Sequence, residues 1–262
     1  MTRLQWATII VAIVGVFVLY FGFDTKSTKE KSDLKQVEKE GISIDIQPLI
    51  ESAKGTLSST DEREITSLEN RTETEEGPEK MTALKELSGK WYRLAKPHIA
   101  GYYAEEVAEM EKSGEAWSIA ATTYVAGIGG SSEPFISDWC LNKAIAAFEN
   151  AISLDPEVSQ YRVNLALLYA EKPPTDDPMK GVQMLLSMNE KDPDDVLVLN
   201  ALARLAIKTG QWERAKDRLL RADSLQPDNI TTVCLLATVY QELNDEQAQA
   251  TKDKCELLTS KR

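Results

Sequence analysis

The stretch VLVLNALARLAIKTGQWERAKDRLLRADSLQPDN, residues 196–229, decides the fold. Its first half carries apolar residues at the i, i+3, i+4, i+7 spacing of one helical face, at Leu199, Leu202, Ala203 and Ala206. Gly210 follows, and glycine suits the left-handed position just past a helix end. The second half repeats the helical spacing, at Ala215, Leu219 and Ala222. Because Pro227 stops this second run, the stretch predicts two short amphipathic helices packed as an antiparallel hairpin.

A hairpin of this kind leaves its outer apolar faces uncovered, so it needs neighbours of the same kind. The sequence supplies three more such patterns, in residues 114–158, 159–195 and 230–258. Each first helix has a small residue where a neighbouring helix must approach, at Ala121, Ala166, Ala203 and Ala237. Pro156 and Pro193 close two of the patterns in the way that Pro227 closes the quoted one.

This arrangement resembles the tetratricopeptide repeat (TPR) family, and in particular the membrane-anchored TPR proteins of bacteria. The family has a period of 34 residues and the pattern W-x2-L-G-x2-Y…A-x3-F…P, which residues 196–229 follow without an insertion. The sequence departs from the family by placing alanine where the family has glycine in the first helix. The resemblance implies an all-α fold, a TPR-type α-solenoid of antiparallel helix pairs behind a single N-terminal transmembrane helix.

The N-terminal segment is apolar enough to cross a membrane. Residues 4–23 contain no charged residue, and about 20 helical residues span about 30 Å, the hydrocarbon thickness of a bilayer. A cleaved signal peptide would have a shorter apolar core and a small-x-small cleavage site, which the sequence after Tyr20 does not offer. A buried core helix fits poorly, because no other part of the chain could cover this segment on every side. We therefore expect residues 1–23 to be a single-pass anchor with a short tail in the inner (cell) membrane.

The charges beside the anchor bear on the side of the membrane that the rest of the chain occupies. Arg3 precedes the anchor, whereas a run of lysines between residues 26 and 39 follows it. The positive-inside rule then puts the C-terminal bulk in the cytoplasm. Asp24, Glu30 and Asp33 dilute this local charge, and many anchored bacterial proteins with short tails face outward, so the periplasmic side stays the alternative.

Between the anchor and the repeats the sequence changes character twice. The first part is charged and predicts short helices at 46–57 and 62–68, and the run ENRTETEEGPEK, residues 69–80, is typical of a solvated acidic linker. The second part predicts a divergent helix pair, in which Trp91 lies on the first helix and Pro97 ends that helix. The predicted order is an anchor, a charged and partly helical tether, the divergent pair, four TPR-like units and a tail, at residues 1–23, 24–80, 81–113, 114–158, 159–195, 196–229, 230–258 and 259–262.

Two connections within the units are longer than the family norm. Residues 126–140, AGIGGSSEPFISDWC, contain a glycine cluster that superficially suggests a phosphate loop, but a Walker-type loop needs a lysine after its last glycine and a strand before it. We therefore expect a flexible hairpin loop, with Phe135 and Trp139 either folding back onto the repeat or offering a contact site. The second insertion ends at Asp177 and Pro178, a good helix start because aspartate caps and proline sits where no amide hydrogen is needed.

Composition argues against several classes of function. A net charge of −12 repels phosphate backbones, so nucleic acid is not an expected partner. The only histidine is His98 and no C-x2-C pair exists, which leaves no ligand set for a zinc site and no histidine-based triad. We expect no catalytic residues, no metal, no cofactor and no small-molecule substrate. Cys140, Cys234 and Cys255 are expected as small buried thiols, and pairing of Cys234 with Cys255 across the last hairpin is left open.

The resemblance also implies a binding surface. In the family, fixed positions of each first helix line a concave wall that suits an extended peptide or a partner helix. Carried over by phase, the candidate partner-binding residues are Ser118, Thr122, Leu167, Asn200, Arg204, Thr238 and Gln241. Asn200 and Arg204 resemble the residues with which some family members bind carboxylates, and we expect this pair to contact a partner.

Two functions fit these patterns. The first is a membrane-tethered protein–protein interaction module, a scaffold, assembly factor or adaptor that binds a protein or peptide partner on the concave TPR surface. The second is a fixed structural subunit of a stable membrane or envelope complex. Neither is enzymatic, and the sequence names no partner.

Overall fold

The computed structural model describes residues 44–130 and 133–261, and in these ranges the protein is built from α-helices without a strand. The predicted anchor at residues 4–23 lies outside the described residues, as does the tether up to residue 43. Within the part that is described, no helix is both long and apolar enough to cross a membrane.

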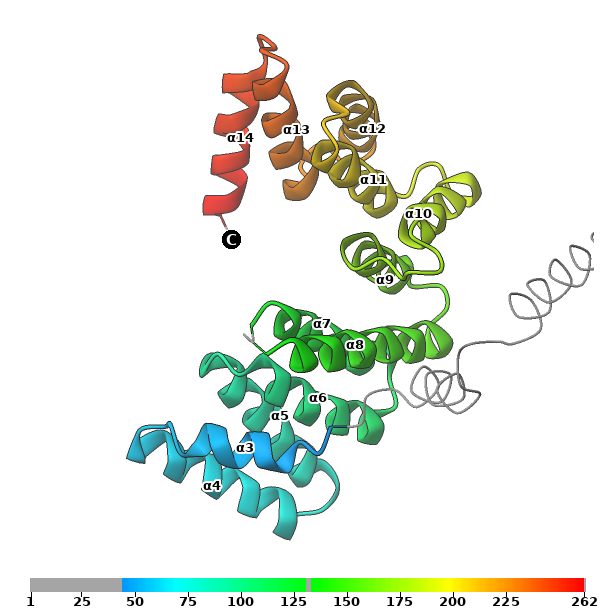
Figure 1. Ribbon diagram of the computed structural model, residues 1–262. Helices are drawn as coiled ribbons and strands as arrows, with labels where there is room; N and C mark the ends of the chain where they lie inside the picture. Colours follow the sequence, from blue (N-terminus) through cyan, green and yellow to red (C-terminus); the bar gives the residue numbers. More distant parts are fainter. Residues whose placement is uncertain (1–43, 131–132, 262) are drawn as a thin grey trace, which may run out of the picture. The chain divides into compact units, whose positions relative to one another are not determined.

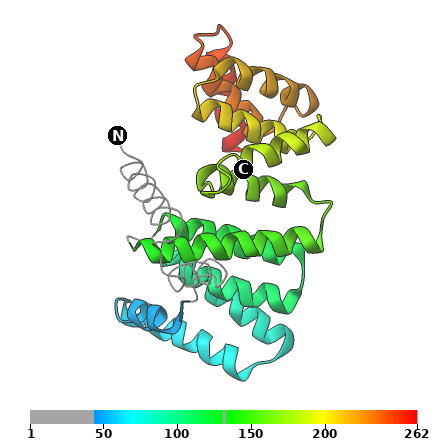
Figure 2. The same ribbon diagram turned by 45° about the vertical axis from the view of Figure 1, so that its right-hand side comes forward.

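Each helix packs against the next one along the chain from α4 onward, and the most extensive contacts join α5 to α6, α6 to α7 and α7 to α8. Figures 1 and 2 show the successive helices side by side, joined by short turns. The helices are α3 (Gln47–Lys54), α4 (Ser59–Thr74), α5 (Gly77–Arg93), α6 (Pro97–Glu111), α7 (Gly114–Ile128), α8 (Pro134–Leu154), α9 (Ser159–Glu171), α10 (Lys180–Lys191), α11 (Val196–Lys208), α12 (Trp212–Leu225), α13 (Ile230–Glu242) and α14 (Ala248–Ser260).

The hairpin predicted for residues 196–229 is confirmed as α11 and α12. Asp195 caps α11, because its side chain accepts hydrogen bonds from the Leu197 and Val198 amides. Gly210 takes the left-handed conformation after the helix, with φ of +70°. The two helices and the next hairpin share one apolar cluster of buried residues, made of Ala203, Ala206, Ala215, Leu219, Leu236, Val239 and Tyr240. Neighbouring hairpins therefore cover each other's apolar faces, as the sequence requires.

The terminal hairpin ends the stack with a polar helix. α13 buries Leu236, Val239 and Tyr240 in the cluster that it shares with α12, whereas α14 buries no residue. The polar sequence of residues 245–258 predicted this exposure, because a terminal repeat meets solvent on one side.

The predicted acidic linker at residues 69–80 is wrong, because α4 continues to Thr74 and α5 begins at Gly77. Charged side chains of α4 pair with opposite charges on α3 and α5, which reduces the repulsion that we expected to keep the run extended. The ion pairs that join α4 to α3 and α5 are Lys54–Glu69 at 2.7 Å, Arg71–Glu86 at 2.7 Å, Lys90–Asp61 at 2.8 Å and Lys90–Glu64 at 2.5 Å. α4 also buries Ile65 and Leu68, so it belongs to the packed helices and does not act as a tether.

The predicted flexible loop at residues 126–140 is also wrong over most of its length. α7 runs to Ile128 and α8 begins at Pro134, so Phe135 and Trp139 both lie on a helix. Trp139 is buried and packs edge-on against the Tyr124 ring. The extra residues lengthen the paired helices because apolar side chains at helical spacing continue back from the repeat.

Proline and aspartate mark helix starts differently from our expectation. α10 begins at Lys180 after Met179 and has no side-chain cap, so the start predicted at Asp177 and Pro178 is wrong. The Asp177 carbonyl accepts a hydrogen bond from the Lys180 amide, which places both residues in the turn before the helix. Pro97 is the first residue of α6, while α5 already ends at Arg93.

The two helices of the α9–α10 hairpin approach each other most closely at Gly181. A Cβ atom at this position would press against the Ala166 carbonyl oxygen and would lie 2.6 Å from the Ala170 nitrogen, both of which are backbone atoms of α9. We therefore expect Gly181→Ala to lower the free energy of unfolding by about 1–3 kcal/mol, measured by urea denaturation.

Gly89 in α5 provides the matched control for this substitution. The nearest atom to a Cβ there is the flexible Arg93 guanidinium, at 3.4 Å. Because alanine is the better helix former, Gly89→Ala should raise stability by about 0.5–1 kcal/mol. Equal effects of the two substitutions would contradict the close approach at Gly181.

Candidate binding grooves

Two adjoining hollows lie between α5 and α7, with α6 beneath the first of them. The first has a volume of about 280 Å³ and the second about 480 Å³, and they share Ser88 and Ile119. We call this continuous surface the N-terminal groove. It is lined by Lys85, Ser88, Gly89, Tyr92 and Arg93 of α5, Ala104, Val107 and Glu111 of α6, and Glu115, Ala116, Ile119, Thr122 and Thr123 of α7.

The N-terminal groove exposes two large apolar side chains, one from α5 and one from α7. Tyr92 is 53% exposed and Ile119 is 54% exposed, and both line the second hollow. Ala104 and Val107 form an apolar floor beside them in the first hollow. A concave apolar surface with a polar rim is characteristic of interaction sites.

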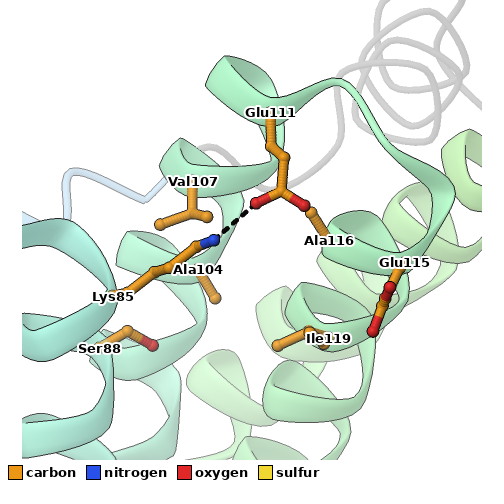
Figure 3. A pocket seen from close by; sticks show the side chains of 8 residues that line it. All are labelled: Lys85, Ser88, Ala104, Val107, Glu111, Glu115, Ala116 and Ile119. Atoms are coloured by element: carbon orange, nitrogen blue, oxygen red, sulfur yellow. Dashed lines mark hydrogen bonds and ion pairs between the residues drawn. The ribbon is translucent and has the colours of Figure 1, made fainter. Parts of the chain in front are cut away.

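The rim of the N-terminal groove carries opposite charges at its two ends. Figure 3 shows the ion pair that bridges α5 and α6, in which Lys85 Nζ lies 2.7 Å from Glu111 Oε2. Hydrogen bonds from Lys85 and Ser113 lower the pKa of the Glu111 carboxyl. Glu115 at the same end and Arg93 at the far end form no ion pair with any described residue. An acidic end and a basic end are thus available to a partner.

A third hollow, of about 150 Å³, lies between α9, α11 and α13. We call it the C-terminal groove, and it brings together three of the predicted partner-binding residues, Leu167, Asn200 and Arg204. Its other lining residues are Gln160, Val163, Asn164, Leu197, Ala201, Asn229 and Thr231. The hollow thus lies at the first helices of three successive hairpins, and the binding role of its residues stays a prediction.

The two residues of the predicted pair, Asn200 and Arg204, differ in their exposure to solvent. Asn200 is only 5% exposed, and its Oδ1 accepts a hydrogen bond of 3.0 Å from the Thr232 hydroxyl of α13. This contact fixes α11 against α13, so most of Asn200 is turned away from a partner. Arg204 is exposed and forms no ion pair within the residues that the structure describes.

The remaining predicted residues are dispersed. Thr122 lines the N-terminal groove, but its hydroxyl donates to carbonyl oxygens of its own helix. Ser118 is half-buried on α7, and Thr238 and Gln241 are exposed on α13, all outside the two grooves.

Sequence reasoning missed Tyr92 and Ile119, which dominate the N-terminal groove. The available signal was a large apolar residue one or two positions after Trp91 and Trp117, off the buried stripe of each helix. Nothing in one sequence indicates that these two side chains line the same hollow.

Two features of the described residues bear on catalysis and metal binding, the state of His98 and the grouping of potential metal ligands. His98 is buried, its Nδ1 has no hydrogen-bond partner there, and burial together with the nearby Lys96 charge lowers its pKa. No group of three or more potential metal ligands gathers within 44–130 and 133–261. The prediction that the protein is not an enzyme stays a prediction.

Comparison with known proteins identifies the fold. No protein-family model matches the sequence, and no curated protein matches it. Among solved structures, the TPR protein TTC0263 of Thermus thermophilus matches with a TM-score of 0.50 and 19% identity, over 69% of this chain and 91% of that one. A tetratricopeptide repeat protein from Parabacteroides merdae matches with a TM-score of 0.50 and 17% identity, over 79% and 77%.

A further match, MamA from Desulfovibrio magneticus RS-1, has a TM-score of 0.42 and 17% identity, over 70% of this chain and 96% of that chain. The first two likenesses show that the described helices have the TPR fold, as the sequence predicted.

We predict that Asn200 and Arg204 respond differently to truncation. Asn200→Ala removes the acceptor of a buried hydrogen bond and should lower the free energy of unfolding by about 1–3 kcal/mol. Arg204→Ala removes an exposed side chain and should change stability by less than about 0.5 kcal/mol. Urea denaturation of both variants measures the difference, and a neutral Asn200→Ala would show that the Asn200–Thr232 contact does not hold α11 on α13.

Proposed function

We propose that this protein is a membrane-tethered interaction module that binds a segment of a partner protein in the N-terminal groove. The observation that carries the proposal is the pair of exposed apolar side chains, Tyr92 of α5 and Ile119 of α7, which line the same concave surface. Their burial by a partner would remove apolar surface from water, which is the main favourable contribution to most protein association.

The dimensions of the N-terminal groove suit a short segment. Lys85 and Arg93 on α5 are eight positions apart, which corresponds to about 12 Å along a helix. A partner helix of two turns or a few extended residues would cover this length. Its central apolar side chain would lie between Tyr92 and Ile119, in the manner of a helix that lays its apolar face into a groove.

Charge then sets the direction in which the segment lies. A basic side chain of the partner would face Glu115, and an acidic one would face Arg93. Rim charges of this kind contribute more to specificity and association rate than to affinity. Arg204 in the C-terminal groove offers a further contact for a longer acidic partner.

The membrane part of the proposal rests on the sequence. Residues 4–23 are apolar over about the thickness of a bilayer, and an anchor of this length would keep the module at the membrane. Tethering would raise the local concentration of the module for partners that are themselves in the membrane.

Site-specific photo-crosslinking tests the partner site in cells. A photoreactive amino acid is placed at Ile119 of the full chain, and in the control at Leu257 on α14, which is equally exposed at 54%. We expect cross-linking to another polypeptide from position 119 and not from position 257. When the photoreactive amino acid is placed at Tyr92 instead, Ile119→Asp should abolish the cross-link. Equal cross-linking from both positions, or none from 119, would contradict the proposal.

The yield and number of cross-linked partners separate the two functions. Several partners in substoichiometric amounts support an interaction module, whereas one partner in stoichiometric amount supports a fixed structural subunit.

Alkaline carbonate extraction tests the tether: the full chain should stay with the membrane, and deletion of residues 2–23 should release it.

A further inference from the structure

Cys234 of α13 and Cys255 of α14 form a disulfide, with Cα atoms 5.0 Å apart. This separation lies within the range of about 4.4–6.8 Å that a disulfide bridges without backbone movement. The expectation of buried free thiols is therefore wrong for this pair, which is half-buried, and is confirmed for Cys140, which is buried and unpaired.

The disulfide lies where the stack has little else to hold its last helix. α14 buries no residue, and only Ala248 packs partly against the apolar cluster of the preceding hairpins. The polar links are Lys216–Asp245 at 2.6 Å in the turn before α14, and Lys254, which donates to the Pro227 carbonyl. A covalent bond between α13 and α14 compensates for the missing apolar contact.

We propose that Cys234–Cys255 is a structural disulfide introduced by a dithiol oxidase, and that the helical region therefore lies on the oxidising, extracytoplasmic side of the membrane. Structural disulfides form and persist in oxidising compartments and are rare in the cytosol, where thiols are kept reduced. The part of the inference that concerns a membrane side rests on the proposed tether, whereas the oxidation itself does not.

The oxidation is a two-step thiol–disulfide exchange. The thiolate of one cysteine attacks the disulfide of the oxidase, which forms a mixed disulfide and releases one oxidase thiol. The thiolate of the second cysteine then attacks the mixed disulfide, so that the Cys234–Cys255 bond forms and the second oxidase thiol leaves. Two protons and two electrons pass from the two cysteine thiols to the oxidase disulfide, which becomes a dithiol.

The third cysteine does not compete in this reaction. Cys140 is fully buried against Gly127 in the α7–α8 hairpin, and burial raises the pKa of its thiol to about 12. A buried protonated thiol is a poor nucleophile, so pairing is directed to the two half-buried cysteines of the terminal hairpin.

This assignment reverses the orientation that the flanking lysines predict. The positive-inside rule is counted over short loops, and long domains translocate largely regardless of charge. The sequence after residue 24 is long enough to escape the rule, and acidic residues alternate with its lysines. The disulfide is then the stronger indicator of the side.

Thiol counting on the full chain in its host cells tests the proposal. Cells are quenched with acid, and free thiols are labelled with maleimide–polyethylene glycol under denaturing conditions, with and without prior reduction. The chain has 3 cysteines in total, so we expect one labelled thiol before reduction and all of them after it. Labelling of every cysteine before reduction would overturn the proposal.

Two variants make the assignment specific, and both are read under denaturing conditions, so folding defects do not interfere. Cys140→Ser should abolish labelling before reduction. Cys255→Ser should instead add one labelled thiol, that of Cys234. Any other labelling pattern would assign the disulfide to a different pair and overturn the proposal.

The membrane side is measured with alkaline phosphatase fused after Arg262. This enzyme is active only in an oxidising compartment. An active fusion supports the assignment, and an inactive fusion of full length overturns it. Failure of cross-linking at Ile119 together with an oxidised pair would remove the proposed function and leave this inference standing.

Discussion

The close approach of the two helices within a hairpin is the constraint on which the structure depends. At the α9–α10 crossing, Gly181 packs directly on the α9 backbone beside Ala166. At α11–α12, Ala203 and Ala215 take the corresponding buried positions. Small residues let the paired helices lie close, so the larger apolar side chains project outward to the neighbouring hairpins. The first helices α9, α11 and α13 then lie side by side, and the C-terminal groove lies between them.

In α3, α4 and α5, ion pairs between helices contribute to the packing that apolar contacts provide in the repeats. Lys54, Arg71 and Lys90 each pair with a carboxylate of another helix. Partly exposed pairs of this kind contribute about 0–1 kcal/mol each, so they select the register of packed helices more than they stabilise them. Deeper in the stack, Glu105 accepts from the buried Tyr124 hydroxyl and pairs with Lys143, which links α6, α7 and α8.

The sequence was sufficient for the helix pattern of the clearest hairpins. The helical spacing of residues 196–229, the turn at Gly210 and the polar character of α14 all follow from local pattern and backbone preference. The TPR fold follows from the repetition of that pattern. The repeat boundaries and the anchor stay predictions.

Some errors were local, such as the start of α10 and the extent of α7 and α8, and others concern a side chain whose partner lies on another helix. Residues 69–80 were expected to be solvated because the ionic partners of Glu69 on α3 and of Arg71 on α5 are distant in sequence. Asn200 was assigned to a partner because its acceptor role toward Thr232 joins two hairpins. Tyr92 and Ile119 were missed because the hollow that both line forms only when α5 and α7 each pack on α6.

Binding of a partner segment on the groove faces of α5 and α7 can be measured by hydrogen–deuterium exchange of the full chain, alone and with the partner captured at position 119. We expect slower exchange in residues 85–93 and 115–123 on binding, with α12 and α14 unchanged. Slower exchange confined to α12 and α14, or no change in α5 and α7, would contradict it.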